Sequence, residues 1–337
     1  MSHLVSVTEI HAAADRLDGV VVHTPLVPFA GIYPPLLVKA ESLQPTGAFK
    51  LRGAYSAISA LSPPQRSRGV VAHSSGNHAS AVAYAAALLS VPATVVVPSN
   101  APRVKVEITR SHGARVVVCE PGLAARTEAV DELVARHGYT PIPPFEHRDV
   151  IAGQGTVGLE ISVDCPDIEL VVCPVGGGGL IAGVAAAITA VNPAARVVGV
   201  EPELAADARD SLRAGRRVAW PAAQTQRTIA DALRVDEVGE LPMMHIRAQV
   251  DDIITVTDDE IRAAMRVLVS GARLVAEPGG AVAVAACLFR SDELPHAGRR
   301  VAILSGGNVD PGMLADILGA PGDELPIAPG HLAAASD

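Results

Sequence analysis

The sequence predicts an α/β fold in which open parallel sheets form two domains. Seven short runs of apolar, mostly β-branched residues have the composition of strands, and helical patterns separate them. Uninterrupted apolar strands that alternate with helices are typical of parallel sheets covered by helices on both faces. The expected strands are residues 69–74, 93–98, 114–120, 168–175, 195–201, 251–257 and 299–305.

Two helices stand out between these strands. Residues 77–90 follow the first expected strand and are rich in alanine. Residues 257–271 open with Thr257 and carry Glu260 three positions later. This spacing is a capping box, in which each side chain accepts a backbone N–H that the helix start leaves unpaired. The sequence therefore predicts that the second helix begins next to Thr257.

The domain organisation is predicted from two interruptions of the strand–helix alternation. One is the proline-rich and charged stretch 141–149, and the other is the proline-containing stretch that precedes Gly69. We expect a large domain made of residues 1–68 and 147–320, with a small α/β domain of residues 69–146 inserted in it. The last stretch, 321–337, is rich in Pro, Gly and Ala and is expected to be a loose tail.

Composition excludes several classes of function. The chain has 337 residues, is 49% hydrophobic and has a net charge of −9 without a basic run, which argues against a nucleic-acid partner. We find neither a signal-peptide pattern nor a stretch of roughly 18 apolar residues, so no membrane association is expected. The chain is expected to be cytoplasmic, with its four cysteines present as reduced thiols.

Lysine is rare in this chain. Only three of the 27 basic residues are lysine, and one of them, Lys50, lies inside the stretch PTGAFKLRGA at residues 45–54. Arginine supplies charge but keeps its proton in proteins, whereas a lysine amine can be tuned to act as a nucleophile or a base. Lys50 is therefore the first candidate catalytic residue.

A glycine-rich loop is the second candidate feature. The stretch PVGGGGLIAG at residues 174–183 follows an expected strand and opens a helix, where backbone N–H groups bind anions such as phosphate. Gly177, Gly179 and Ala182 also fit the dinucleotide pattern G-x-G-x-x-A, with Glu201 about 20 residues further on to bind a ribose. A phosphate cup, a dinucleotide site and an ordinary tight turn all remain open for this loop.

Two further loops show a similar pattern, in which the end of an expected strand is followed by small polar residues. They are HSSGNHAS at residues 73–80 and LSGGNVD at residues 304–310. The carboxyl ends of strands in open α/β sheets converge on the crevice where ligands bind. A tunable lysine, a phosphate cup and neutral polar loops together suggest pyridoxal phosphate, held by Lys50 as a Schiff base. Ser305 would be a neutral partner for the pyridine nitrogen.

Six motifs, in this order along the chain, carry a resemblance to a known family. They are PTGAFKLRGA, SSGNHA, VIAGQGTVGLE, PVGGGGLIAG, TIADALR and LSGGNVD. The chain resembles the fold type II pyridoxal-phosphate enzymes that include threonine and serine dehydratases and serine racemases. The resemblance implies a tryptophan synthase β-like architecture, with two open parallel-sheet domains and the cofactor in the cleft between them.

The resemblance assigns roles around the cofactor. Lys50 would form the covalent link, Phe49 would pack near the ring, and Asn77 would donate a hydrogen bond to the phenolic oxygen. Ser305 would meet the ring nitrogen and Glu277 would lie near the ring. The phosphate would be held by the glycine loop and the residue after it, which are Gly176, Gly177, Gly178, Gly179 and Leu180.

The same resemblance suggests how substrate is bound. Ser75 lies at a position on the cofactor face opposite the lysine, where many threonine dehydratases have alanine and racemases have serine. Removal and return of a proton on two faces needs a group on each face, so Ser75 makes racemisation possible. Ser74 and His78 are expected beside the substrate, and Arg126 is expected to pair with a substrate carboxylate.

The resemblance also implies a divalent cation. Glu201 and Asp207 would supply carboxylates and Ala205 a backbone carbonyl to Mg²⁺ or Ca²⁺, both of which prefer oxygen ligands. The expected function is a pyridoxal-phosphate ammonia-lyase for serine, threonine or threo-3-hydroxyaspartate. The alternative is a serine or aspartate racemase that uses Lys50 and Ser75 as an acid–base pair. Family members are usually dimers or larger, so a homodimer is expected.

Overall fold

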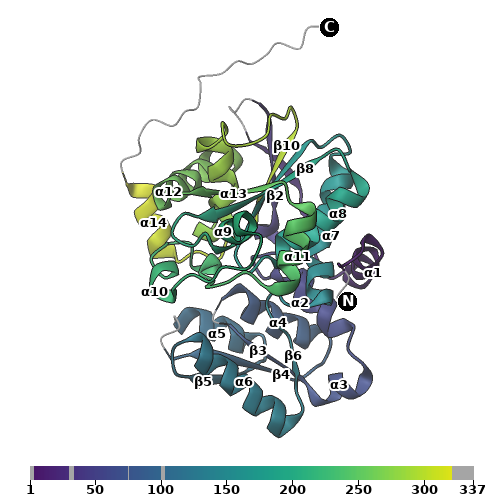
Figure 1. Cartoon of the computed structure of the whole chain (residues 1–337). Helices are drawn as coiled ribbons and strands as arrows, with labels where there is room; N and C mark the ends of the chain where they lie inside the picture. The colour runs from purple at the N-terminus through teal and green to yellow at the C-terminus, as the bar shows by residue number, and fades with distance from the viewer. Residues whose placement is uncertain (1–3, 30–33, 75, 100–102, 321–337) are drawn as a thin grey trace.

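The computed structural model describes residues 4–29, 34–74, 76–99 and 103–320 (Figure 1). It contains two sheets, one with six strands in the order β1-β2-β10-β7-β8-β9 and one with four in the order β5-β4-β3-β6. The larger sheet consists of β1 (Leu26–Phe29), β2 (Leu36–Ala40), β7 (Leu170–Pro174), β8 (Arg196–Pro202), β9 (Asp252–Val256) and β10 (Arg300–Leu304). The smaller sheet consists of β3 (Val70–His73), β4 (Ala93–Pro98), β5 (Arg115–Cys119) and β6 (Thr140–Pro141).

All seven expected strands are confirmed, and each pairs with its neighbours in parallel. One departure from the expected fold is the antiparallel pair of β1 with β2 at the edge of the larger sheet. Three strands were not anticipated: β1, β2 and the two-residue β6, which lies at the start of the stretch expected to be a domain crossing. Two of these contain proline, which weakens the sequence pattern of a strand.

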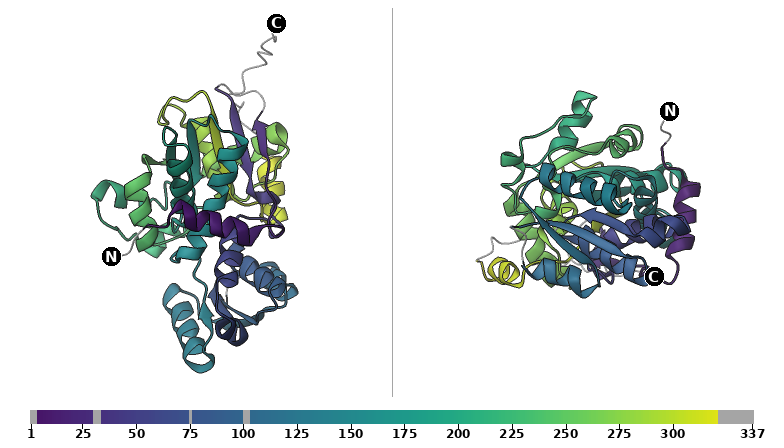
Figure 2. Two further views of the ribbon diagram at one scale, coloured as in Figure 1. Left: turned by 90° about the vertical axis from the view of Figure 1, so that its right-hand side faces the viewer. Right: turned by 90° about the horizontal axis from the view of Figure 1, so that it is seen from below.

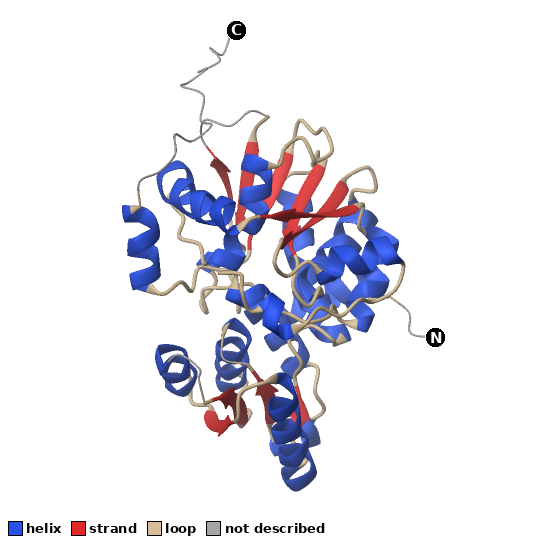
Figure 3. Cartoon of the chain, turned by 60° about the vertical axis from the view of Figure 1, so that its left-hand side comes forward, coloured by secondary structure: helices blue, strands red, loops and turns tan. Residues whose placement is uncertain are grey.

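The helices lie on both faces of each sheet, as Figures 2 and 3 show. The helix expected after Thr257 is confirmed, since the Thr257 side chain accepts the Glu260 N–H in a capping box. The first seven helices are α1 (Val7–Leu17), α2 (Lys50–Ser59), α3 (Pro63–Arg68), α4 (Asn77–Leu88), α5 (Arg103–Ser111), α6 (Leu123–His137) and α7 (Arg148–Asp164). The remaining seven are α8 (Gly179–Val191), α9 (Asp207–Ala214), α10 (Ala222–Thr225), α11 (Glu240–Gln249), α12 (Asp258–Val267), α13 (Pro278–Phe289) and α14 (Pro311–Gly319).

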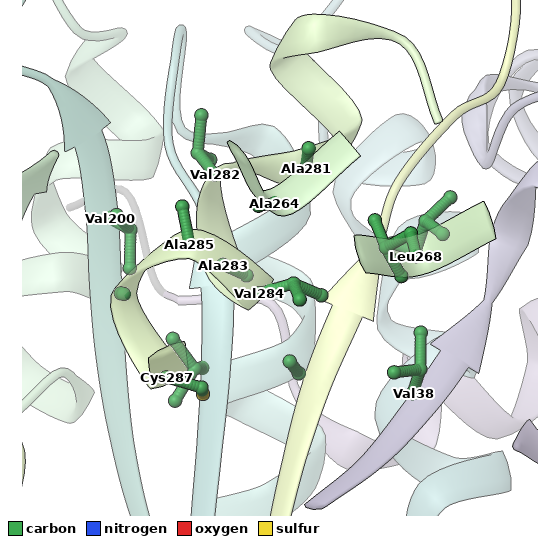
Figure 4. Close-up of a cluster of buried hydrophobic side chains, with 14 of the residues drawn as sticks. Val38, Val200, Ala264, Leu268, Ala281, Val282, Ala283, Val284, Ala285 and Cys287 are labelled. Carbon is green, nitrogen blue, oxygen red and sulfur yellow. The ribbon is translucent and has the colours of Figure 1, made fainter. Parts of the chain in front are cut away.

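Alternate side chains of the larger sheet enter two separate hydrophobic cores. Leu170 and Val172 of β7 pack with α12 and α13, while Val171 and Cys173 pack with α7 and α8. Figure 4 shows the first of these cores, where the small side chains of α13 lie across the strands. Because successive residues of a strand point to opposite faces, a wholly apolar strand serves two cores at once.

Helix α2 connects the two parts of the molecule. Its residues Leu51, Ala54 and Ile58 share one buried cluster with Val70 of β3 and with residues of α4. The same helix also packs against α7, which covers the larger sheet. The expected domain border at residue 69 falls inside this cluster, so we propose that the smaller domain begins with α2. The expected tail, residues 321–337, lies outside the described residues.

A buried cluster of ions fixes the position of α2. The Arg52 guanidinium lies 2.7 Å from Glu41 of the 3₁₀ turn Glu41–Leu43 and 2.6 Å from Glu160 of α7. The ammonium of Lys39, on β2, lies 2.6 Å from the same Glu160 carboxylate. Lys39, Glu41 and Arg52 are fully buried. Burial alone would raise the pKa of Glu41, but the charge and hydrogen bonds of Arg52, the hydrogen bond from Thr24 and the charge of Lys39 together hold this pKa below its ordinary value.

The cysteines are free thiols, as expected for reduced residues. Burial raises the pKa of Cys287 to about 12, so that thiol stays protonated at neutral pH. Among the described residues, no helix combines the length and the apolar character that are needed to cross a bilayer.

We expect Arg52→Met to destabilise the protein strongly, because it leaves the buried carboxylate of Glu41 without its cation. Breaking a buried pair in this way costs about 3–5 kcal/mol in the free energy of unfolding. The matched control is Arg262→Met, which removes an exposed pair with Asp259 and should cost about 0–1 kcal/mol. Urea denaturation measures the free energy of unfolding of both variants. Equal losses would contradict a stabilising role of the buried cluster.

Candidate active site

Lys50 lies where two polypeptide segments cross at the end of the larger sheet. The backbone N–H of Phe49 donates to the carbonyl of Ser305 at 3.0 Å, which places the start of α2 at the carboxyl end of β10. The Lys50 ammonium donates to the carbonyl of Pro144 at 2.9 Å and lies 5.0 Å from the centre of the Phe49 ring. This position agrees with the crevice expected at the strand ends.

The electrostatics of Lys50 favour the neutral amine. Burial lowers the pKa of Lys50 from 10.5 to about 8, although the Glu277 carboxylate acts in the opposite direction. An ordinary lysine is almost wholly charged at neutral pH and cannot attack a carbonyl. The environment of Lys50 therefore produces a nucleophilic amine at mildly alkaline pH.

The glycine loop lies between β7 and α8 and is packed tightly by its neighbours. A side chain at Gly177 would overlap the Phe145 ring, and a Cβ at Gly179 would lie 2.9 Å from the Cβ of Phe145. Gly178 has a φ of +86°, a conformation that favours glycine. These glycines are required by packing and backbone conformation. Among the described residues, no side chain caps the N-terminus of α8, and such a helix start suits an anion.

The segment that carries Phe145 contacts three elements through consecutive residues. Pro144 offers its carbonyl to Lys50, Phe145 covers the glycine loop, and the Glu146 carboxylate accepts the N–H of Leu241 at 2.8 Å at the start of α11. From the sequence, this stretch was interpreted only as a domain crossing. Phe145 and Glu146, which lie between the prolines and α7, are the sequence signal that could have indicated these contacts.

Asn77 joins the smaller domain to the larger one. Its Nδ2 donates to the Glu277 carboxylate at 2.5 Å, and its Oδ1 accepts from Asn308 Nδ2 at 2.9 Å. Glu277 lies just before α13, and Asn308 follows β10. Ser305 is buried at the end of β10 and is tied to Phe49 through its backbone carbonyl. The structure thus brings the residues expected around a cofactor ring to one end of the larger sheet.

His78, on α4, is held in its neutral form. Its Nε2 donates to the carbonyl of Ile142 at 2.8 Å, so the other ring nitrogen carries the lone pair. Burial, reinforced by the nearby Lys50 charge, lowers the pKa of His78 to about 3. Among the described residues, Nδ1 of His78 has no hydrogen-bond partner although it is buried. His78 can therefore accept a hydrogen bond from a ligand but cannot act as an acid at neutral pH.

Arg126 lies on α6, beside the end of β3. Its Nε donates to the carbonyl of Gly122 at 3.1 Å. Burial lowers the pKa of His73, and the Arg126 charge lowers it further, so the guanidinium lies near the last residue of β3. The next residue, Ser74, accepts the Gly76 N–H at 3.2 Å. Ser75 lies outside the described residues, and its role stays a prediction.

The acidic residues expected to bind a metal lie at the end of β8 and at the start of α9. Glu201 caps α9 by accepting the N–H groups of Ala208 and Arg209 at 3.0 and 2.8 Å. Burial and the neighbouring Asp207 raise the pKa of Glu201 well above its ordinary value. Burial also raises the pKa of Asp207 to about 7, and the nearby carboxylates of Asp236 and Glu237 act in the same direction.

The carboxylate of Asp207 is buried, and neither of its oxygens has a hydrogen-bond partner among the described residues. Ala205, whose carbonyl completes the expected ligand set, is buried beside it. Within the described part of the chain, no three His, Cys, Asp or Glu side chains gather into a metal-binding group. The pair of carboxylates suits a cation, but side chains alone do not form a full ligand set.

The pKa of Lys50 predicts how covalent binding of an aldehyde depends on pH. Only the neutral amine attacks, so the rate at which pyridoxal phosphate becomes linked to cofactor-free protein should rise with pH around a midpoint near 8. Glu277→Gln removes the charge that raises this pKa, so the midpoint should fall. Glu293→Gln, at an exposed position, is the control. A midpoint near 10.5 would contradict the burial argument; absorbance stopped-flow measures it.

Comparison with known proteins explains this arrangement. Residues 17–306 match the family described as pyridoxal-phosphate dependent enzyme. The chain is 43% identical over 273 residues to L-threo-3-hydroxyaspartate ammonia-lyase from Saccharomyces cerevisiae, covering 81% of this chain and 82% of the relative. It is 44% identical over 284 residues to L-threonine ammonia-lyase from Thermotoga maritima, covering 84% and 69%.

A solved structure gives the same assignment. The structure of maize serine racemase superposes with a TM-score of 0.89 at 38% identity, over 93% of this chain and 97% of that chain. The dinucleotide interpretation of the glycine loop was therefore wrong, and Glu201 caps α9 instead. A lysine amine with a lowered pKa and a glycine loop at the start of a helix together suit an aldehyde that carries a phosphate. The chain belongs to the family of pyridoxal-phosphate-dependent enzymes.

Proposed function

We propose that this enzyme is an ammonia-lyase that converts L-serine or L-threonine to the 2-oxo acid and ammonia, with L-threo-3-hydroxyaspartate as a third candidate substrate. The observation that carries the proposal is the high identity, over more than four fifths of this chain, to two ammonia-lyases of these substrate classes. The reaction removes the α-proton and the β-hydroxyl as water, and hydrolysis of the product then releases ammonia and the 2-oxo acid.

The residues of this chain fit pyridoxal phosphate. Bound there, the cofactor supplies an electron-withdrawing ring that stabilises negative charge at the substrate Cα. Lys50 would hold the aldehyde carbon, the glycine loop the phosphate, and Ser305 the ring nitrogen. Phe49 would pack near the ring, and Leu180 would extend the phosphate cup. The low pKa of Lys50 and the start of α8, which no described side chain caps, support these roles.

Lys50 is also the proposed base for the α-proton. Its pKa of about 8 leaves a substantial fraction as the neutral amine near physiological pH. The carbonyl of Pro144, 2.9 Å from Nζ, limits the directions in which the free amine can point. We propose that this contact holds the amine on one face of the bound substrate, so that the proton is removed from that face.

Racemisation is the second candidate function. Ser75 would return a proton on the face opposite Lys50. The similarity to maize serine racemase supports this second candidate. His78 and Ser74 would bind substrate beside it. The lone pair of His78 Nδ1 suits a substrate ammonium or hydroxyl, because both donate hydrogen bonds.

We further propose a divalent cation at Glu201, Asp207 and the Ala205 carbonyl. The unpartnered, buried carboxylate of Asp207 supports it, because an oxygen-only site of this kind suits Mg²⁺ or Ca²⁺. Water molecules would complete the coordination. The homodimer and the cytoplasmic location expected from the sequence stay predictions.

The proposal is tested by incubating the purified enzyme with pyridoxal phosphate and each of L-serine, L-threonine and L-threo-3-hydroxyaspartate. We expect 2-oxo acid to form quickly with little D-isomer, and Lys50→Ala to abolish the reaction. Abundant D-isomer with slow 2-oxo acid would favour the racemase instead. A lack of both products from all three substrates would refute the proposed function.

In this assay, Arg126→Met should separate the substrates. If hydroxyaspartate is a substrate, the loss of a guanidinium–carboxylate pair should raise the KM for hydroxyaspartate about tenfold or more. The KM for serine should change less than about twofold. The matched control is Arg136→Met, on the exposed face of the same helix. Equal changes for both substrates would show that Arg126 does not bind a second carboxylate.

The cation proposal has a readout that is independent of activity. Ca²⁺ or Mg²⁺ should raise the Tm of the protein by about 3 °C or more, because a ligand that binds only the folded state stabilises it. Asp207→Asn should remove this rise, whereas Asp259→Asn, at an exposed position, should keep it. A rise of the same size in both variants would place the cation elsewhere.

A further inference from the structure

Four groups from four separate stretches of the chain form a hydrogen-bonded relay at the proposed cofactor ring. The Asn308 Nδ2 donates to the backbone carbonyl of Thr46 at 2.8 Å and to Asn77 Oδ1 at 2.9 Å. The Asn77 Nδ2 in turn donates to the Glu277 carboxylate at 2.5 Å. The relay therefore runs from a backbone carbonyl, through two amides, to a carboxylate.

The direction of this relay is fixed at both ends. A backbone carbonyl only accepts hydrogen bonds, so the nitrogen of Asn308, and not its oxygen, must face Thr46. The same nitrogen then carries the hydrogen that reaches Asn77, whose oxygen must face Asn308. At the other end the ionised Glu277 also only accepts, which agrees with the nitrogen of Asn77 facing it. Reversing either amide would place two oxygen acceptors against each other.

Backbone packing holds Asn308 in this place. Gly47 has a φ of +72°, and a side chain at that position would overlap the Asn308 amide oxygen. The N–H of Gly307 donates to the carbonyl of Gly47 at 2.9 Å, so the two loops interlock. Thr46 and Gly47 lie just before Lys50, and the relay is thereby tied to the segment that carries the catalytic amine.

We propose that Asn308 is a positioning residue that fixes the amide of Asn77, so that an N–H and not a C=O faces the phenolic oxygen of the cofactor. The inference rests on the proposed cofactor function and deepens it. An asparagine amide alone can turn either way, and its oxygen would repel an ionised phenolic oxygen. With Asn308 in place, the nitrogen of Asn77 gives one hydrogen to Glu277 and keeps its second hydrogen for the cofactor.

The test compares two cofactors, because a general loss of stability would affect both. The dissociation constant of the protein is measured for pyridoxal phosphate and for the analogue that lacks the 3-hydroxyl. We expect the wild-type protein to prefer pyridoxal phosphate, and Asn308→Asp to lower this preference about tenfold, the size of one charge-assisted hydrogen bond. The aspartate cannot donate to Asn77 and competes with Glu277 for its nitrogen, so the amide would no longer be held in the orientation that offers an N–H to the cofactor.

Two further variants complete the experiment. Asn308→Ala removes the donor without adding a charge and should lower the preference less, and it supplies the measurement if Asn308→Asp does not fold. Asp310→Asn alters a neighbouring residue that caps α14 and should leave the preference unchanged.

Asn77→Ala should abolish the preference for pyridoxal phosphate. If it does, an unchanged preference in Asn308→Asp would overturn the proposal. Where the aspartate variant does not fold, an unchanged preference in Asn308→Ala would overturn it. Asn77 would then be oriented by other contacts. If the wild-type protein binds neither cofactor, it is the proposed function that fails and not the relay alone.

Discussion

The structure depends on the buried cluster in which Arg52 lies between Glu41 and Glu160. Two carboxylates and two cations that are removed from water are stable only when each is paired, so the cluster permits very few arrangements of the segments that carry it. Those segments are the end of β2, the first turn of α2, and α7. Lys50 is two residues before Arg52, and its direction follows from this constraint.

Lys39 and Lys50 show how environment separates two lysines of the same chain. Lys39 lies 2.6 Å from a carboxylate and completes the buried cluster. Lys50 instead faces a neutral carbonyl, and burial lowers its pKa to about 8. In a chain whose basic residues are mostly arginine, Lys50 is a lysine whose proton burial makes easier to remove. Composition drew attention to lysine, and the neighbours show that it is Lys50 whose pKa is lowered by burial.

The strands could be predicted from the sequence, and Lys50 could be selected as a candidate, because both signals are local. Apolar β-branched runs give the parallel strands directly, whereas β2 was missed because it contains the charged Lys39, whose partner Glu160 lies 121 residues away. The pattern of the glycine loop was ambiguous for a similar reason. Its glycines accommodate Phe145, and the sequence cannot distinguish close packing from anion binding. The contact between Asn77 and Asn308 spans 231 residues and depends on the backbone of Gly47.

The location of the site on two domains follows from the same contacts. Asn77 belongs to α4 of the smaller domain, while Glu277 and Asn308 belong to the larger one. Helix α2 shares the hydrophobic cluster of the smaller domain, but its ion cluster ties it to β2 and α7 of the larger domain. Lys50 and the glycine loop thus lie on segments held to the larger sheet, whereas Asn77 and His78 lie on α4, which packs against the smaller sheet.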